Sequence, residues 1–129
     1  MNQLSGTIKH TKSSEGITHI TIEVCDTILS SLILGDEEEY QKNEKVHLLF
    51  KETEVMIASK ESIVSARNAF VSPITYINMG EILAEIHFDF NGIQIVSVVT
   101  RGALYDLKCN VGDKFLWFVK SNEVSIAKV

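Results

Sequence analysis

The hydrophobic positions of this chain recur with a period of two, which is the period of a β-strand with one buried face. Apolar side chains occupy every second position from Ile82 to Phe90, mostly with polar side chains between them. The dipeptide Asn91-Gly92 follows and suits the positive φ angles of a type I′ turn. A second β-rich run, Ile93–Val99, comes directly after it. The pattern predicts a β-hairpin over residues 82–99.

The same pattern predicts strands along most of the chain. They are expected at Gln3–Ile8, Ile17–Val24, Thr27–Leu34, Lys45–Phe50, Glu54–Ala58, Ile63–Ile77, Lys114–Val119 and Glu123–Ala127. Helix signals are confined to Asp36–Lys42 and Gly102–Leu107, which have room for one or two turns each. Many short strands at even spacing indicate an all-β protein, built as a small barrel or a sandwich.

The two halves of the chain resemble each other. Lys51–Ala58 aligns with Lys120–Ala127 without a gap, sharing Lys, Glu, Val, Ile and Ala, and Lys45 matches Lys114 in the same register. Farther upstream, Asn2 aligns with Asn68. Ordered matches of this kind indicate a duplication. We therefore predict two units, 1–61 and 62–129, joined by a short polar connection.

Composition narrows the class of protein. The chain has 129 residues, and 12 Lys and Arg against 17 Asp and Glu give a net charge of −5, which argues against a dedicated duplex-DNA binder. The N-terminal segment is polar and the apolar runs are strand-sized, so neither a secretion signal nor a membrane span is expected. Cys25 and Cys109 form no C-x-x-C motif, which is typical of a reduced, cytoplasmic protein.

No catalytic or metal-binding pattern stands out. The four histidines lack H-x-x-x-H and H-E-x-x-H spacing, so no site for a bare metal cation is predicted. A nucleophile with an adjacent base, or a pair of carboxylates, is not evident, and we expect no enzyme. An OB-type binder of single-stranded nucleic acid would need a basic groove with exposed aromatics, whereas this chain is acidic and 8% aromatic.

The second half carries a set of ordered motifs. Ser65-Ala66-Arg67-Asn68 is followed by Gly80–Ile86, Val98–Arg101, Leu107–Gly112 and Val119–Val124. In this order and spacing the half resembles the Mop family, also called molbindins or TOBE domains, and the first half resembles it more weakly. The resemblance implies two tandem OB-like five-stranded small barrels. It also implies homo-oligomers, with a trimer of tandem chains favoured by analogy, that bind molybdate or tungstate at interfaces between barrels.

The resemblance also implies which residues hold the oxyanion. The matching positions here are Ser65, Arg67, Asn68, Lys120, Ser121 and Asn122, with Thr100 as a further candidate. The first unit departs from the family, because it lacks Ser-Ala-Arg and places Glu52 beside Lys51, where a carboxylate repels an anion. A composite site remains open, in which Lys51 or Thr53 of one barrel faces the Ser-Ala-Arg segment of another.

These residue types suit a tetrahedral dianion, because hydroxyls and cations supply hydrogen-bond donors that converge from several directions. Each also has a structural interpretation. Lys120 is compatible with a surface lysine that guards an edge strand, Ser65 and Thr100 with ordinary strand residues, and Arg67 with an ion-pair partner of Glu81 or Glu85. The acidic run Asp36–Glu39 is typical of a solvated loop.

Two functions follow from this reading. The first is a non-enzymatic protein that stores, buffers or senses molybdate or tungstate in the cytoplasm. The alternative is a regulatory module that acts on a transcription regulator or a transporter subunit, with its anion binding partly lost. The chain itself has neither a helix-turn-helix pattern nor a phosphate-binding G-x-x-x-x-G-K-[ST] loop.

Overall fold

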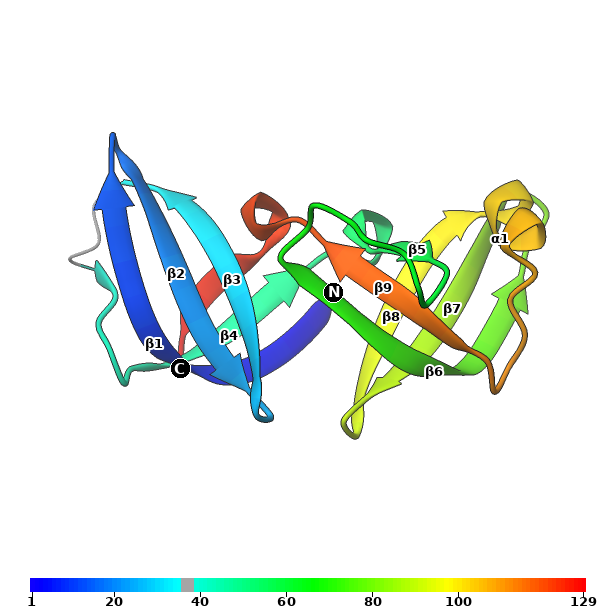
Figure 1. The fold of residues 1–129 in the computed structure, drawn as a ribbon, viewed down its shortest axis with the longest axis horizontal. Helices are drawn as coiled ribbons and strands as arrows, with labels where there is room; N and C mark the ends of the chain where they lie inside the picture. The colour runs from blue at the N-terminus through cyan, green and yellow to red at the C-terminus, as the bar shows by residue number, and fades with distance from the viewer. Residues whose placement is uncertain (36–38) are drawn as a thin grey trace.

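The computed structural model describes residues 1–35 and 39–129, which form two curled antiparallel sheets lying end to end (Figure 1). The first sheet has the order β10-β4-β1-β2-β3. Its strands are β1 (Asn2–Ser14), β2 (Ile17–Val24), β3 (Thr27–Leu34), β4 (Lys45–Phe50) and β10 (Ser125–Lys128). The second sheet has the order β5-β9-β6-β7-β8. Its strands are β5 (Met56–Ala58), β6 (Asn68–Met79), β7 (Leu83–Phe90), β8 (Ile93–Thr100) and β9 (Lys114–Val119).

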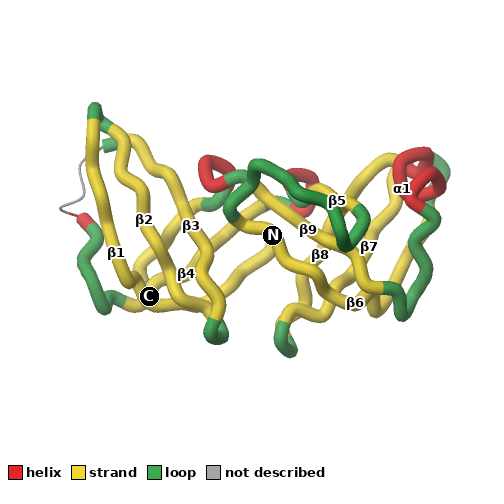
Figure 2. Tube along the Cα trace, in the orientation of Figure 1, coloured by secondary structure: helices red, strands yellow, loops and turns green. Residues whose placement is uncertain are grey.

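Helices are short and lie between strands, as Figure 2 shows. The 3-10 helices η2 (Glu52–Glu54) and η3 (Ser121–Glu123) occupy equivalent places in the two halves, and α1 (Arg101–Leu107) follows β8. In the part of the chain that the structure describes, no helix is both long and apolar enough to cross a membrane. The predicted all-β class, with two five-stranded sheets of the OB-like kind, is confirmed.

The two halves exchange one strand each. β5 belongs to the first half of the chain but pairs with β9, and Ile57 lies opposite Trp117. β10 belongs to the second half but pairs with β4, and Ile126 lies opposite Leu48. Each sheet is therefore completed by a strand from the other half. The units 1–61 and 62–129 stay a prediction about the duplication of the sequence.

Most predicted elements are present. The hairpin over residues 82–99 is confirmed, since β7 pairs with β8 and both Asn91 and Gly92 have positive φ. The helical turns at Gly102–Leu107 are confirmed as α1. The expected turns at 36–42 and the acidic run 36–39 fall partly on residues 36–38, outside the described residues.

Four strand boundaries were predicted wrongly. The strand expected from Ile63 begins only at Asn68, because the segment 63–67 lies over the first sheet and makes no strand ladder. Glu54 and Glu123 end 3-10 turns and do not begin strands. β1 extends to Ser14, six residues past its predicted end at Ile8, after a bulge between Ile8 and His10. A bulge shifts the alternation of faces, which hides the rest of the strand from a period-two pattern.

An aromatic cluster joins the two sheets. Trp117 of β9 is fully buried, and its ring stacks on Phe50 of β4 with centroids 6.1 Å apart. Phe90 of β7 meets the same indole edge-on at 5.3 Å. The indole N–H donates to Ser72 Oγ at 3.0 Å, so the polar end of the ring is satisfied. Trp117 therefore has a packing role, and the two sheets share one core.

Candidate functional site

Asn68 fastens the second half of the chain to the first sheet. It is the first residue of β6 and is fully buried. Its Oδ1 accepts the backbone N–H of Ser30 at 2.7 Å, and its Nδ2 donates to the Ser30 carbonyl at 3.0 Å. β3 is the last strand of its sheet, so the backbone groups at its free edge lack a strand partner. The side-chain amide of Asn68 takes the place of that missing strand.

The segment just before Asn68 forms one wall of a cavity. Residues 65–67 border a space of about 440 Å³ together with His19 and Thr21 of β2 and Ser30 of β3. The cavity opens over the outer face of the first sheet, because Ile20 and Ile22 on the alternate positions of β2 lie in the core. Ser65 and Arg67 are both exposed. Their groups are therefore accessible to a small solute.

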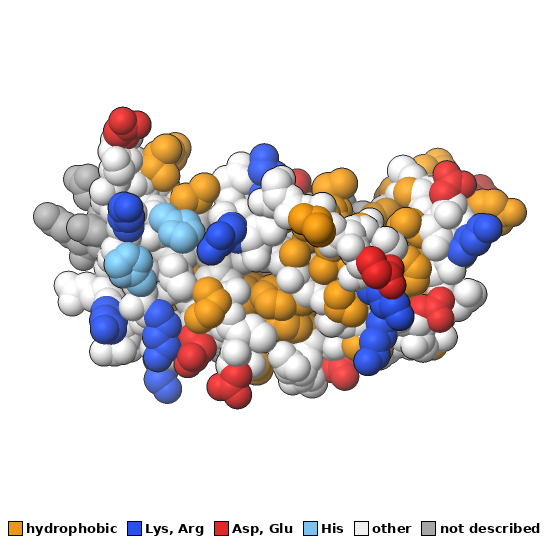
Figure 3. Space-filling view, in the orientation of Figure 1, with side chains coloured by type: hydrophobic (Ala, Val, Ile, Leu, Met, Phe, Trp, Pro, Cys, Tyr) orange, Lys and Arg blue, Asp and Glu red, His pale blue; other side chains and the backbone are white. Residues whose placement is uncertain are grey.

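Basic side chains gather on this outer face. In the β1–β2 ladder Lys12 lies opposite His19 and His10 lies opposite Thr21, which places all four side chains on one face. Burial lowers the pKa of His19, and the nearby positive groups of Arg67 and His10 lower it further. Figure 3 shows histidine side chains with Lys and Arg side chains beside them over the first sheet. The cationic side chains of Lys12 and Arg67 therefore lie on this face, in a chain whose net charge is −5.

η3 brings a second motif of the same half to Ser30. Ser121 is buried, and its hydroxyl forms a hydrogen bond with the hydroxyl of Ser30. Lys120 is the N-cap of η3 and is exposed. Asn122 is exposed and borders an apolar pocket with Ile17 and residues 32–34. The structure therefore brings Ser65, Arg67, Asn68 and Ser121 together around Ser30, with Lys120 and Asn122 adjacent. We call this region the first junction.

The other candidate residues lie elsewhere. Lys51 is the N-cap of η2 and Thr53 lies within it, and η2 packs against β8 of the second sheet. Thr100 ends β8, and its hydroxyl accepts the Ala103 N–H at 3.2 Å as the N-cap of α1. Within one chain, Lys51 and Thr53 are associated with one sheet and the segment 65–67 with the other. The Thr100 hydroxyl has a structural partner of its own.

The structure gives no support to the alternative that Arg67 is an ion-pair partner of Glu81 or Glu85. Glu85 is paired with His87 at 2.6 Å, and the ion pairs found among residues 1–35 and 39–129 do not include Arg67. Its exposed guanidinium instead borders the cavity of the first junction, next to His19. This position suits an anion ligand, because a guanidinium presents several donors in one plane.

Sequence reasoning missed the first-half contributors to this junction: His10, Lys12, His19, Thr21 and Ser30. One signal was present, since Ser30-Ser31 interrupts the apolar strand Thr27–Leu34. Both serines are buried, on opposite faces of β3. Ser31 faces inward and donates to the Val124 carbonyl at 2.6 Å. Two adjacent buried hydroxyls in an apolar strand indicate polar partners on both faces.

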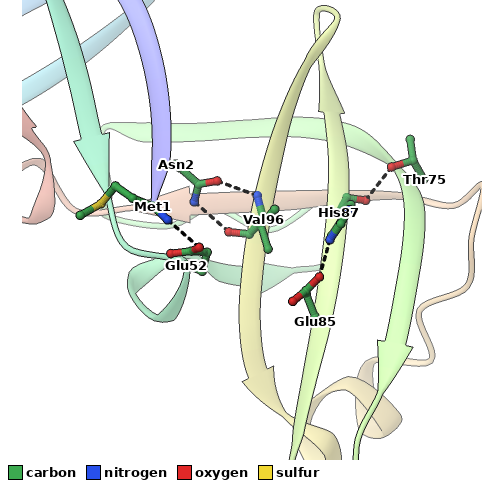
Figure 4. A network of polar contacts seen from close by, with 7 residues as sticks. All are labelled: Met1, Asn2, Glu52, Thr75, Glu85, His87 and Val96. Carbon is green, nitrogen blue, oxygen red and sulfur yellow. Dashed lines mark hydrogen bonds and ion pairs between the residues drawn. The ribbon is translucent and has the colours of Figure 1, made fainter.

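The duplication creates a related region on the second sheet, which we call the second junction (Figure 4). Asn2, the first residue of β1, accepts the N–H of Val96 and donates to its carbonyl, each at 2.8 Å. Val96 lies on β8, the free edge of the second sheet. Glu52 lies beside it in η2, with Oε2 2.7 Å from the amino group of Met1.

This architecture defines a tandem small-barrel protein, in which two five-stranded sheets share strands and one core. The solved structure of the cytoplasmic molybdate-binding protein ModG, in a PEG-grown form with molybdate bound, superimposes with a TM-score of 0.92. The match covers 99% of this chain and 96% of that one, at 21% sequence identity. At this identity the likeness establishes the fold, and it confirms the predicted tandem barrels.

The sequence comparisons gave no further match. No family model matches the chain, and no curated protein matches it.

Proposed function

We propose that this protein binds a tetrahedral oxyanion of the molybdate and tungstate class at the first junction. The observation that carries the proposal is the cavity bordered by residues 65–67, His19 and Ser30, on the same face as Arg67, His10 and Lys12. The fold shared with ModG, whose crystals hold molybdate, supports the choice of ligand.

The chemistry of the cavity supports an anionic guest. Ser65 and Thr21 supply hydroxyl donors, and Arg67 supplies a cationic fork. A hydrogen bond to a charged group contributes about 1.5–3 kcal/mol, so four or five of them offset dehydration and still leave micromolar affinity. Asn68 and Ser121 act as positioning residues, because both are buried against Ser30. Lys120 and Asn122, the neighbours of Ser121 in the chain, are proposed as a further cation and a further amide donor.

The proposed role is storage, homeostasis or sensing of the oxyanion in the cytoplasm, without catalysis. The likeness to a binding protein described as cytoplasmic supports this role. A homo-oligomer, with a trimer favoured, is part of the proposal. It is supported by exposed apolar side chains along β3, where Leu32 and Leu34 border the pocket next to Asn122. In such an assembly Lys51, Thr53 or Thr100 of a second copy would complete a site.

Calorimetric titration with molybdate, tungstate and sulfate tests the proposal. We expect micromolar binding of molybdate or tungstate and much weaker binding of sulfate, because cavity size and rigid donors discriminate between the anions. Arg67→Ala should weaken binding at least tenfold. Arg101→Ala is the matched control, since Arg101 is exposed and its guanidinium bonds the Gly80 carbonyl. Absence of heat with all three anions rejects the proposal, and light scattering of the same samples reports the oligomer.

A further inference from the structure

The two junctions have the same backbone frame. Thr21 lies opposite Ser30 in the first sheet, and His87 lies opposite Val96 in the second. Asn68 binds both backbone groups of Ser30, and Asn2 binds both backbone groups of Val96. The positions that surround the two asparagines can therefore be compared one by one.

The next residues along β3 and β8 extend the correspondence. Ser31 donates to the Val124 carbonyl at 2.6 Å, and Ser97 donates to the Val55 carbonyl at 2.6 Å. Val124 and Val55 are the C-caps of η3 and η2. The frame is thus conserved on the inner side of both edge strands, and differences between the junctions lie in their outward-facing side chains.

The charged side chains on the outer faces do not correspond. His19 pairs with Lys12 across the β1–β2 ladder, whereas the equivalent pair across β6 and β7 is Glu85 with Asn78. Figure 4 shows the Glu85 carboxylate pointing at His87, and the two side chains lie 2.6 Å apart. The ammonium of Lys12 and the imidazole of His19 on the first face are replaced by the amide of Asn78 and the carboxylate of Glu85 on the second.

The remaining residues around the two asparagines also differ, with fewer hydrogen-bond donors and more negative charge at the second junction. Arg67 precedes Asn68, whereas Met1 precedes Asn2. Ser121 in η3 aligns with Glu52 in η2, and Val96 provides no hydroxyl where Ser30 has one. The second junction has lost a guanidinium and three hydroxyls, those of Ser121, Ser30 and Thr21, and has gained the carboxylates of Glu52 and Glu85. Carboxylates repel a dianion and accept hydrogen bonds without donating any.

We propose that each chain binds one oxyanion, at the first junction, and that the second junction excludes dianions because Glu52 and Glu85 stand where the first has Ser121 and His19. This inference rests on the proposed function and adds the stoichiometry of binding and the exclusion of dianions at the second junction. The two junctions thus share the backbone contacts of Asn68 and Asn2 but differ in the side chains that surround them.

Equilibrium dialysis of the full chain against tungstate, with tungsten counted per chain by mass spectrometry, tests the inference. We expect one equivalent per chain. Arg67→Met gives the first junction the residue found at the second, and it should weaken binding at least tenfold. Ser121→Glu should also weaken binding at least tenfold. If this buried substitution prevents folding, Arg67→Met alone tests the first junction. Glu52→Ser is the matched change at the second junction and should leave the tight equivalent unchanged within twofold.

The outcomes separate the two proposals. Two equivalents per chain, or a fraction of one, overturn the inference and leave oxyanion binding standing. If the Arg67→Met variant still binds one tungstate per chain and the Glu52→Ser variant does not, the site lies at the second junction. That result also overturns the inference. No binding by the unaltered chain refutes the proposed function and the inference with it.

Discussion

Replacing Asn68 with alanine should destabilise the whole chain, because one side chain satisfies two buried backbone groups. The substitution leaves the N–H and the carbonyl of Ser30 without partners, and Ser30 is only 4% exposed. An unsatisfied buried donor or acceptor costs about 1–3 kcal/mol, so the loss of partners for these two groups should lower the free energy of unfolding by about 2–6 kcal/mol. This is a large share of the roughly 5–15 kcal/mol that stabilises a typical domain.

Urea denaturation followed by tryptophan fluorescence measures this loss, because the single Trp117 lies in the shared core. Asn78→Ala is the matched control, since Asn78 lies on the same strand but is exposed. Its free energy of unfolding should change by less than about 0.5 kcal/mol. Equal effects of the two substitutions would refute the role given to the Asn68 amide.

A second variant tests the geometry of that contact. Asn68→Asp places a carboxylate oxygen where Nδ2 donates to the Ser30 carbonyl, so the two oxygens repel each other. Burial and this repulsion raise the pKa of the new carboxyl above its unfolded value. The destabilisation should therefore be fully present at neutral pH and shrink as the pH falls and the carboxyl regains a proton to donate. A penalty that does not depend on pH would contradict the contact.

Three further predictions concern other parts of the molecule. Burial raises the pKa of Cys109 to about 11, so roughly one Cys109 thiol in a thousand is ionised at pH 8. Mass spectrometry after treatment with iodoacetamide should therefore find the label first on Cys25, which is exposed. Equal labelling of the two cysteines would contradict this. Burial lowers the pKa of His19, so its neutral form contributes stability that is present above about pH 6.5 and lost at lower pH. A bound dianion should raise that pKa, and calorimetry in buffers of different ionisation enthalpy should detect proton uptake near pH 6; identical heats would argue against it. Ser97→Ala removes the donor to the buried Val55 carbonyl and should lower the free energy of unfolding by about 1–3 kcal/mol, with an unchanged urea midpoint as the contrary result.

Local features of the chain predicted the elements that depend on local physics. The alternation from Ile82 to Phe90 and the Asn91-Gly92 turn determine a hairpin, because side-chain period and positive φ are properties of neighbouring residues. The segment 63–67 was predicted as strand for the same reason and wrongly, since β-rich composition does not reveal whether a ladder partner exists.

The sequence predicted part of the site, namely the residue types in its motifs, and left open which partners those residues meet. The order of the motifs placed Ser65, Arg67, Asn68 and Ser121 in one list, and the structure gathers them around Ser30. Their ligand roles stay predictions. Thr100 was chosen by the same order, but its hydroxyl caps α1. A motif fixes which residue types occur, whereas the partner that each one meets depends on the fold.

The sequence by itself therefore determined the all-β class, the duplication and the residue types of one motif. Only the tertiary structure decided that β5 and β10 change sheets, and that Ser30 meets groups 38 and 91 residues away in the chain. It also decided that one face combines Arg67 with His19, whereas its counterpart carries Glu85. Contacts of this kind form between edge strands of different halves, and their energy exists only after both sheets have folded and met.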